Sequence, residues 1–236
     1  DTADQLCEGK KVTYESLTSG LKRILYGLMK KMVIADRLNP FVMNIFTYYS
    51  EVDGGVIALG MIFYTLQLYM DFSGTMDIAL GIGEIFGVKM PENFKQPFFS
   101  KTISEFWTRW HITLGTFLRD YVYYPVSLTD KCKKLTTKLR KKIGNYYGPL
   151  ITSTIALFCV WICNGIWHGS AWNYIFFGMY HFVFILMGRI IEPIVKKLQT
   201  KLHINPNNFA YKGMQIVRTT ILVCIGELFF AAYGLK

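Results

Sequence analysis

Two of the four histidines in this chain directly follow a tryptophan, in the segments Arg109-Trp110-His111 and Ile166-Trp167-His168-Gly169. A partly desolvated imidazole with a pKa near neutrality is suited to removing a proton from a hydroxyl group as that hydroxyl attacks an acyl carbonyl. Gly169 would let a substrate or a backbone segment approach His168 closely. The residues alone leave a structural alternative open, in which both histidines pack between helices and bond to neighbouring carbonyl groups.

Other chemistries have less support from residue spacing. His168 and His181 are 13 residues apart, which is not the three- or four-residue step that places two ligands on one helical face, so no metal site is expected. No Gly-x-Ser-x-Gly segment occurs, and Ser170 has no context typical of a nucleophile. His181 and His203 are interpreted as structural. The five cysteines, Cys7 among them, show no zinc-binding spacing.

The segment around His168 is strongly apolar. Residues 143–188 form a run of 46 residues without Asp, Glu, Lys or Arg, which is long enough for two membrane passes of roughly 20 residues each. The whole chain is 52% hydrophobic and only 18% charged, against about 25% in soluble globular proteins. We therefore predict spans at about residues 148–167 and 172–188, with His168 at the tight turn between them.

Basic residues cluster on both sides of this apolar run. Seven of the twelve residues in 131–142 are Lys or Arg, and a second basic segment covers 189–201. Two crossings return the chain to one side of the membrane, and the positive-inside rule makes that side cytoplasmic. We interpret 131–142 as a loop held near anionic headgroups. The net charge of +10 thus indicates membrane topology rather than nucleic-acid binding.

The remaining segments also have membrane character. Residues 16–38 combine apolar residues at helical spacing with lysines and arginines, which predicts a basic helix at the membrane surface. The charge-free run 54–70 is followed by Asp71 and Asp77, and these carboxylates are expected near a membrane boundary or in a wet cavity. Glycines at 81, 83 and 87 predict a short, broken or re-entrant helix next.

Two further helices are expected downstream. A helix over 104–124 would place Phe106, Trp110, Thr113 and Phe117 on one face, with Arg109 and His111 turned away from its centre. A last apolar segment covers 214–233 and contains Glu227, which must face protein or water rather than lipid.

Five motifs in a fixed order between residues 17 and 188 carry a family resemblance. They are Gly27-Leu28-Met29-Lys30-Lys31 with Ile34-Ala35-Asp36, Tyr69-Met70-Asp71-Phe72-Ser73-Gly74 with Asp77, Pro91-Glu92-Asn93-Phe94, the run from Phe106 to Leu114 continued by Leu118 to Pro125, and Gly165-Ile166-Trp167-His168-Gly169. Together they resemble the membrane-bound O-acyltransferase family, and most of all the bacterial branch that contains alginate O-acetyltransferase and the D-alanine exporter of teichoic acid.

The resemblance implies an all-α, polytopic integral membrane protein, with short re-entrant and interfacial helices besides its spans, around a central tunnel. Residues 1–236 would be a single membrane-embedded acyltransferase domain, a fragment truncated at both ends. The resemblance makes His168 the catalytic residue and places His111 in the same site. Substrate-binding or supporting roles then fall to five residues, namely Asp71, Arg109, Asp120, Asn164 and Trp167. A structural Arg-Asp pair and simple packing of Trp167 stay open as alternatives.

The implied function is transfer of an acyl group, in the first place acetyl, across the bacterial cytoplasmic membrane to a hydroxyl of a cell-envelope polysaccharide. No bound cofactor is expected, and the co-substrate would be an acyl thioester, either acyl-CoA or an acyl-carrier protein. An extracytoplasmic acyltransferase is the expected partner, besides the lipid bilayer. Residues 126–130 depart from the Gly-Gly-Asn turn of the alginate branch, which does not favour alginate itself.

Three alternatives remain at this point. D-Alanine could move from a carrier-protein thioester toward teichoic acid with the same catalytic residues. The protein could be a transporter or channel in which His168 relays protons. It could also be a membrane scaffold, in which case replacing His168 would leave its function intact.

Overall fold

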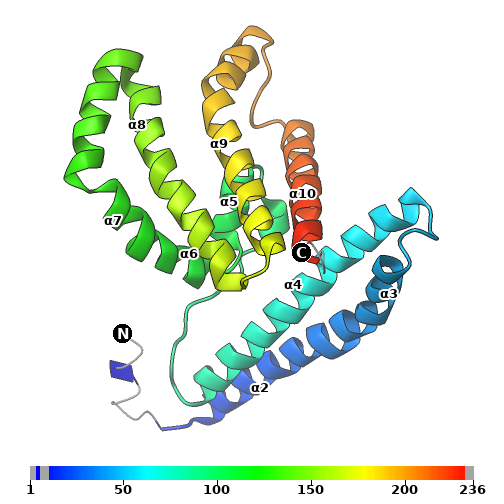
Figure 1. Cartoon of the computed structure of the whole chain (residues 1–236). Coiled ribbons are helices and arrows are strands. Elements are labelled where there is room, and N and C mark those ends of the chain that lie inside the picture. The colour runs from blue at the N-terminus through cyan, green and yellow to red at the C-terminus, as the bar shows by residue number, and fades with distance from the viewer. Residues whose placement is uncertain (1–3, 6–10, 232–236) are drawn as a thin grey trace. The chain divides into compact units, whose positions relative to one another are not determined.

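The computed structural model describes residues 4–5 and 11–231, and these residues form helices and connecting segments without a β-strand element. Four helices are long and apolar enough to cross a membrane, namely α4 (Gly54–Ile85), α8 (Asp130–His168), α9 (Trp172–Lys201) and α10 (Phe209–Ala231). The predicted all-α, polytopic membrane fold is thereby confirmed. The chain forms two compact units, Asp1–Lys95 and Gln96–Lys236, which are described separately (Figure 1). The single domain expected from the sequence stays a prediction.

The helix α2 (Tyr14–Leu28) of the first unit has a capped N-terminus. Thr13 and Ser16 form a capping box at the start of this helix. A π-helical segment, η1 (Met29–Ala35), follows without interruption and leads into α3 (Asp36–Thr47). In η1 the Asp36 amide donates to the carbonyl of Lys31, five residues back, so the turn is wider than an α-turn. The predicted basic helix over 16–38 therefore exists, but a π segment widens it and the helix continues well beyond residue 38.

Helices α2 and α4 pack closely in antiparallel orientation because glycines face each other at two levels (Figure 1). Gly20 lies against Gly81, and seven residues further along α2 Gly27 lies against Gly74. A Cβ atom on Gly27 would come within 2.5 Å of the Gly74 carbonyl oxygen. The prediction of a broken helix at Gly81 is wrong, since α4 runs on to Ile85 and this glycine provides room for α2.

The second unit begins with short elements. They are η2 (Pro97–Phe99), α5 (Ile103–Arg109), α6 (Ile112–Leu118), the π segment η3 (Arg119–Tyr123) and α7 (Tyr124–Ser127). The predicted continuous helix over 104–124 is wrong. Trp110 is extended and His111 has left-handed backbone angles (φ 46°, ψ 54°), so the chain breaks between α5 and α6. Trp110 and Phe117 therefore do not share one helical face.

Helix α8 reverses direction at Gly144, whose φ of +90° is not helical. The basic segment before this residue folds back along the apolar segment after it (Figure 1). Two contacts join the halves: the hydroxyls of Thr136 and Thr152 are 2.7 Å apart, and Gly148 leaves room for the backbone of Arg140. Residues 131–142 are thus helical rather than a loop, which corrects that prediction.

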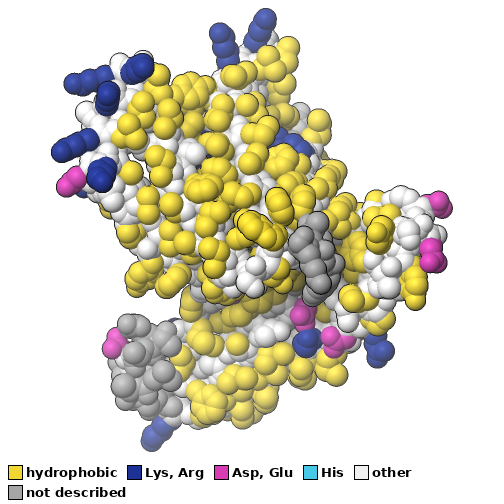
Figure 2. Space-filling view, in the orientation of Figure 1, with side chains coloured by type: hydrophobic (Ala, Val, Ile, Leu, Met, Phe, Trp, Pro, Cys, Tyr) yellow, Lys and Arg dark blue, Asp and Glu magenta, His cyan; other side chains and the backbone are white. Residues whose placement is uncertain are grey.

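The apolar half of α8 and helix α9 form an antiparallel hairpin. At its basic end, the Tyr146 hydroxyl donates to the Arg189 carbonyl at 2.7 Å. Figure 2 shows hydrophobic side chains over the visible face of these helices and Lys and Arg side chains gathered at the far tips of α8 and α9. The two basic segments therefore lie at the same end, as the two-crossing topology predicts.

Candidate functional site

His168 is the last residue of α8, as expected from a turn between two spans. Its half-buried imidazole is surrounded by aromatic rings from α9 and α10. The ring centroids lie 6.2 Å from Tyr174, 5.9 Å from Phe177 and 5.0 Å from Phe230. Asn173 ties the same helices together, since its side-chain amide donates to the Phe230 carbonyl at 3.4 Å. The imidazole is therefore held in a largely apolar setting at the closed end of the helix hairpin.

His111 lies at the break between α5 and α6, in a left-handed backbone conformation that residues other than glycine seldom adopt. Such backbone strain tends to occur at active sites, where the fold holds a residue in a required position. Burial lowers the pKa of His111 below its ordinary value, so the ring is neutral at pH 7. A neutral imidazole can accept a proton or a hydrogen bond.

Trp167 joins the two histidines. Its ring centroid lies 5.7 Å from that of His111 and 4.7 Å from that of His168, both in edge-to-face arrangements. The indole is still 57% exposed. The structure thus brings together His111, Trp167 and His168 from two segments that are far apart in sequence.

Gly169 ends α8 with a φ of +153°, a conformation that favours glycine. A Cβ atom here would lie 2.6 Å from the ring of Tyr174. The role of Gly169 seen in the structure is therefore to let the chain turn while Tyr174 packs beside His168.

Asn164 precedes His168 by one helical turn on α8 and is 6% exposed. Its Oδ1 atom has no hydrogen-bond partner among the described residues. Buried acceptors of this kind are costly, by about 1–3 kcal/mol, unless a partner is supplied. Asn164 is thus placed on the same side of α8 as His168, with an acceptor atom available.

Arg109 and Asp120 were both predicted to support the histidines. In the structure each forms an ion pair with a charged side chain close to it in sequence. Arg109 donates to Glu105 at 2.6 Å, one turn earlier on α5. Asp120 accepts a hydrogen bond from the neighbouring Arg119 at 2.8 Å, and this hydrogen bond lowers the pKa of the Asp120 carboxyl. The open alternative of a structural Arg-Asp pair describes the contact of Asp120 with Arg119, whereas Arg109 pairs with a glutamate.

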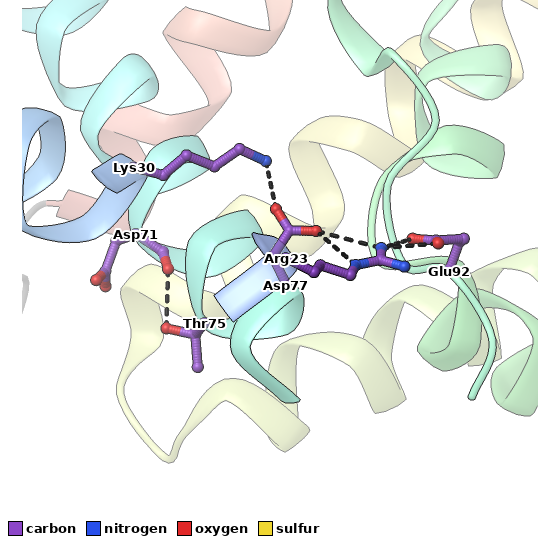
Figure 3. Close-up of polar contacts among 6 residues, drawn as sticks. All are labelled: Arg23, Lys30, Asp71, Thr75, Asp77 and Glu92. Atoms are coloured by element: carbon purple, nitrogen blue, oxygen red, sulfur yellow. Dashed lines mark hydrogen bonds and ion pairs between the residues drawn. The ribbon is translucent and has the colours of Figure 1, made fainter. Parts of the chain in front are cut away.

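Asp71 belongs to the first unit, where it pairs with Lys31 of η1 at 2.5 Å. A larger ionic cluster lies nearby (Figure 3). Lys30 and Arg23 both contact Asp77, at 2.6 Å and 3.2 Å, and Arg23 also reaches Glu92 at 2.7 Å. These pairs balance the carboxylates of α4 against the cations of α2 and η1. The expectation that Asp71 and Asp77 lie near a membrane boundary or in a wet cavity stays a prediction.

The Arg23 side chain also links α2 to the segment after α4. Burial by itself lowers its pKa, but the hydrogen bonds and charges of Glu92 and Asp77 outweigh this and raise the pKa overall. Phe94, two residues after Glu92, packs edge to face on Phe72 of α4 with 5.0 Å between ring centroids. The motif at 91–94 is therefore anchored on the first unit by one ion pair and one aromatic contact.

Sequence reasoning missed the aromatic surround of His168 and assigned His181 a structural role by default. His181 is fully buried on α9, and neither ring nitrogen has a hydrogen-bond partner among the described residues. One signal was present: Asn173, Phe177 and His181 follow each other at four-residue steps, which places two polar residues on one face of an apolar helix.

Two expected features concern other polar groups. Glu227 is 2% exposed on α10 and faces protein rather than lipid, as predicted. Within the described part of the chain, no group of three or more His, Cys, Asp or Glu residues could hold a metal ion. The absence of a metal or bound cofactor stays a prediction, and Cys7 lies outside the described residues.

Comparison with known proteins identifies the family of this chain. Residues 4–139 match the model of MBOAT, the membrane-bound O-acyltransferase family. This match includes Asp71, Arg109, His111 and Asp120, and it ends before His168.

Curated relatives extend the similarity over the rest of the chain. The probable alginate O-acetylase AlgI of Pseudomonas syringae pv. tomato is 32% identical over 100% of this chain and 40% of its own length. The teichoic acid D-alanyltransferase of Bacillus subtilis is 33% identical over 91% of the chain and 51% of its own length. The peptidoglycan O-acetyltransferase of Helicobacter pylori is 34% identical over 79% of the chain and 32% of its own length. The chain thus spans about 40% of the alginate O-acetylase.

Proposed function

The chain belongs to the membrane-bound O-acyltransferase family, and on this premise we propose that the protein transfers an acyl group, in the first place acetyl, to a hydroxyl of a cell-envelope polysaccharide. The observation that supports this most is the grouping of His111, Trp167 and His168, because it places two imidazoles around one exposed aromatic ring. The donor is a thioester, either acyl-CoA or an acyl-carrier protein.

In the proposed reaction His168 is the general base. Its imidazole takes the proton from the acceptor hydroxyl as the hydroxyl oxygen attacks the acyl carbonyl carbon. The new carbon–oxygen bond forms, the carbon–sulfur bond breaks, and the imidazolium returns the proton to the leaving thiolate. His168 is therefore regenerated, and no net proton is consumed.

The surrounding residues have supporting roles in this proposal. The rings of Tyr174, Phe177 and Phe230 limit solvent access to His168. Asn164 supplies an acceptor atom that orients His168 or the attacking hydroxyl. Trp167 provides an apolar platform between the two histidines for the acyl group or a sugar face.

The acceptor lies on the outer side of the bacterial cytoplasmic membrane in this proposal, and the donor lies on the cytoplasmic side. The basic ends of α8 and α9 mark the cytoplasmic end of their hairpin, so His168 lies toward the opposite end. An extracytoplasmic acyltransferase that faces the envelope would assist this transfer to the polysaccharide.

A second candidate is D-alanyl transfer from a carrier-protein thioester toward teichoic acid. It is supported by the relative from Bacillus subtilis, which is 33% identical over 91% of this chain. The same histidines would act, and only the donor and acceptor would change.

The test measures base-labile ester on the envelope polysaccharide of cells that express the complete gene product. Cells carrying His168→Gln or His168→Ala are compared at equal membrane protein levels with His203→Asn, which changes an exposed histidine in a left-handed conformation that Asn tolerates. Loss of acetate only in the His168 variants supports O-acetylation, and loss of D-alanine supports the second candidate. Unchanged levels of both esters would contradict acyl transfer by His168.

A further inference from the structure

His181 occupies an unusual position in the second unit. It is fully buried, yet Nδ1 and Nε2 both lack hydrogen-bond partners among the described residues. More than about 90% of buried polar groups in proteins have a partner, and one left unpaired costs about 1–3 kcal/mol. A leucine or phenylalanine at this position would avoid that cost, so the imidazole calls for a functional explanation.

The imidazole of His181 contacts residues of four helices, α5, α8, α9 and α10. Its ring centroid lies 4.8 Å from that of Trp107 on α5 and 5.6 Å from that of Trp161 on α8. On its own helix it contacts Phe177, again at 4.8 Å. On α10, a Cβ atom at Gly226 would lie 2.6 Å from Nε2, so glycine leaves the space that this ring fills.

These contacts lead to both candidate catalytic residues. Trp107 precedes His111 by four residues and lies in the helix that ends just before it. Trp161 precedes His168 by two turns of α8. Phe177 contacts His168 and His181 directly. A shift of His181 would therefore move the supports of His111 and His168 together.

Trp107 also carries a complementary group. Its indole Nε1 is buried without a hydrogen-bond partner, and it is a donor only. A neutral imidazole has one nitrogen that accepts, so the unpaired donor and the unpaired acceptor belong to rings that already touch.

We infer that His181 is a positioning residue whose imidazole, in contact with Trp107, accepts a hydrogen bond from the indole N–H in the working enzyme, a bond that the structure itself does not contain, and so sets the placement of His111 relative to His168. This inference rests on the proposed acyl transfer and adds a residue that acts through its neighbours rather than on the substrate. It requires the imidazole for its hydrogen-bonding nitrogen as well as for its volume. The two requirements can be separated by substitution.

The experiment uses the complete gene product in membrane vesicles with acetyl-CoA at varied concentration as the donor. His181→Phe keeps the ring and removes both nitrogens, His181→Gln keeps an acceptor, and Trp107→Phe removes the donor. We expect kcat to fall roughly tenfold to a hundredfold in His181→Phe and Trp107→Phe, with KM unchanged, because misplacement by about 1 Å has effects of this size. His181→Gln should recover part of the loss.

Two further comparisons identify the pair and exclude a general loss of packing. The double variant should be no slower than either single variant, since residues that act as a pair are not additive. Ile185→Val, a buried change one turn further along α9, should leave kcat unchanged while lowering stability by about 0.5–1.5 kcal/mol.

A second readout does not depend on turnover. The rates at which diethyl pyrocarbonate modifies His111 and His168, measured by mass spectrometry, should change in both residues in His181→Phe and in neither residue in Ile185→Val. If wild-type vesicles transfer no acetyl group, the proposed acetyl transfer fails, and the modification rates alone decide the inference. Unchanged modification rates, additive kinetic effects, or a kcat within twofold of wild type in His181→Phe would overturn it.

Discussion

The indole of Trp167 meets the imidazole of His111 edge to face, with 5.7 Å between ring centroids, although the two residues come from different helices. The same indole contacts His168. We therefore expect Trp167→Leu to reduce ester formation roughly tenfold to a hundredfold, because the imidazoles lose their common support. Trp167→Phe should retain more activity. The measurement is ester per unit of membrane protein, with Trp172→Leu as a control at a tryptophan of similar exposure. Equal effects of the two leucine variants would contradict a special role for Trp167.

Gly169→Ala should disturb the turn after His168. The positive φ is unfavourable for alanine by about 1–3 kcal/mol, and the new methyl group would meet the Tyr174 ring. We expect a lower temperature of thermal aggregation in detergent and a loss of ester formation. The control is Gly188→Ala inside α9, where no atom lies within 4 Å of the added Cβ. Alanine in a helix interior is favourable by about 0.5–1 kcal/mol, so the control should not be destabilised.

The lowered pKa of His111 predicts how the stability of the protein changes with pH. The folded protein binds this proton less readily than the unfolded chain, whose histidine pKa is about 6.5. Stability linked to His111 is therefore fully present above that pH and is lost as the pH falls toward the folded value.

The corresponding measurement is the free energy of unfolding of wild type and His111→Gln between pH 8 and pH 5. The difference between the two proteins isolates His111 from the other titrating groups. We expect wild type to lose more stability than the variant on acidification below about pH 6.5. A difference that does not change with pH, or one of opposite sign, would show that His111 is not held neutral by burial.

In the ionic cluster of the first unit, neutralising Asp77 should lower the free energy of unfolding more than neutralising Glu92. Asp77 is mostly buried and faces both Lys30 and Arg23, so Asp77→Asn leaves cations without their partner. We expect a loss of roughly 2 kcal/mol, below the 3–5 kcal/mol of a fully buried pair because Arg23 keeps Glu92. Glu92 is more than half exposed, and Glu92→Gln should cost at most about 1 kcal/mol. The free energy of unfolding of the two variants is measured on the complete protein in detergent. Equal losses of stability would contradict the difference in burial between Asp77 and Glu92.

The facing glycines of α2 and α4 provide a further test. Gly27→Ala should be strongly destabilising, because its Cβ would lie 2.5 Å from a backbone carbonyl that cannot move aside without separating the helices. Gly55→Ala at the open start of α4 meets no atom within 4 Å and should be neutral or stabilising. The fraction of protein that remains monodisperse after heating reports both effects. Similar values for the two variants would mean that the helices are not in close contact.

Sequence patterns predicted the spans well because lipid imposes a strong rule on length and charge. The turn at His168, the common end of the two basic segments and the protein-facing Glu227 all follow from the cost of charge in an apolar layer. The helix propensity of single residues was less informative where contacts with another helix determine the local structure. Gly81 was expected to break a helix, yet it lies inside α4. The absence of a side chain at Gly81 leaves room for α2 to pack closely.

The candidate site was predicted only in part. The Trp-His pairs identified His111 and His168. Their common contact with Trp167 depends on the left-handed backbone conformation of His111, which the spacing of apolar residues does not predict. The four-residue spacing of Glu105 and Arg109 was a signal for their ion pair. Asp71 pairs with Lys31 of another element, which charge patterns alone could not assign. His181 was overlooked because a single polar residue in an apolar helix is ordinary until its surroundings are known.

The π segments η1 and η3 let the fold absorb a change of one residue in chain length at two places. Each residue of an α-helix turns it by about 100°, whereas a π segment widens to hold an extra residue without turning the helix after it. Loss of one residue from 29–35 would therefore restore a regular helix and leave the residues after it in register. The buried Val42 and Ile45 of α3 would keep their side of the helix, and the same reasoning applies to the residues that follow 119–123. One deletion inside a π segment should thus be tolerated better than one inside a regular helix such as α4, where it would turn everything after it by about 100°.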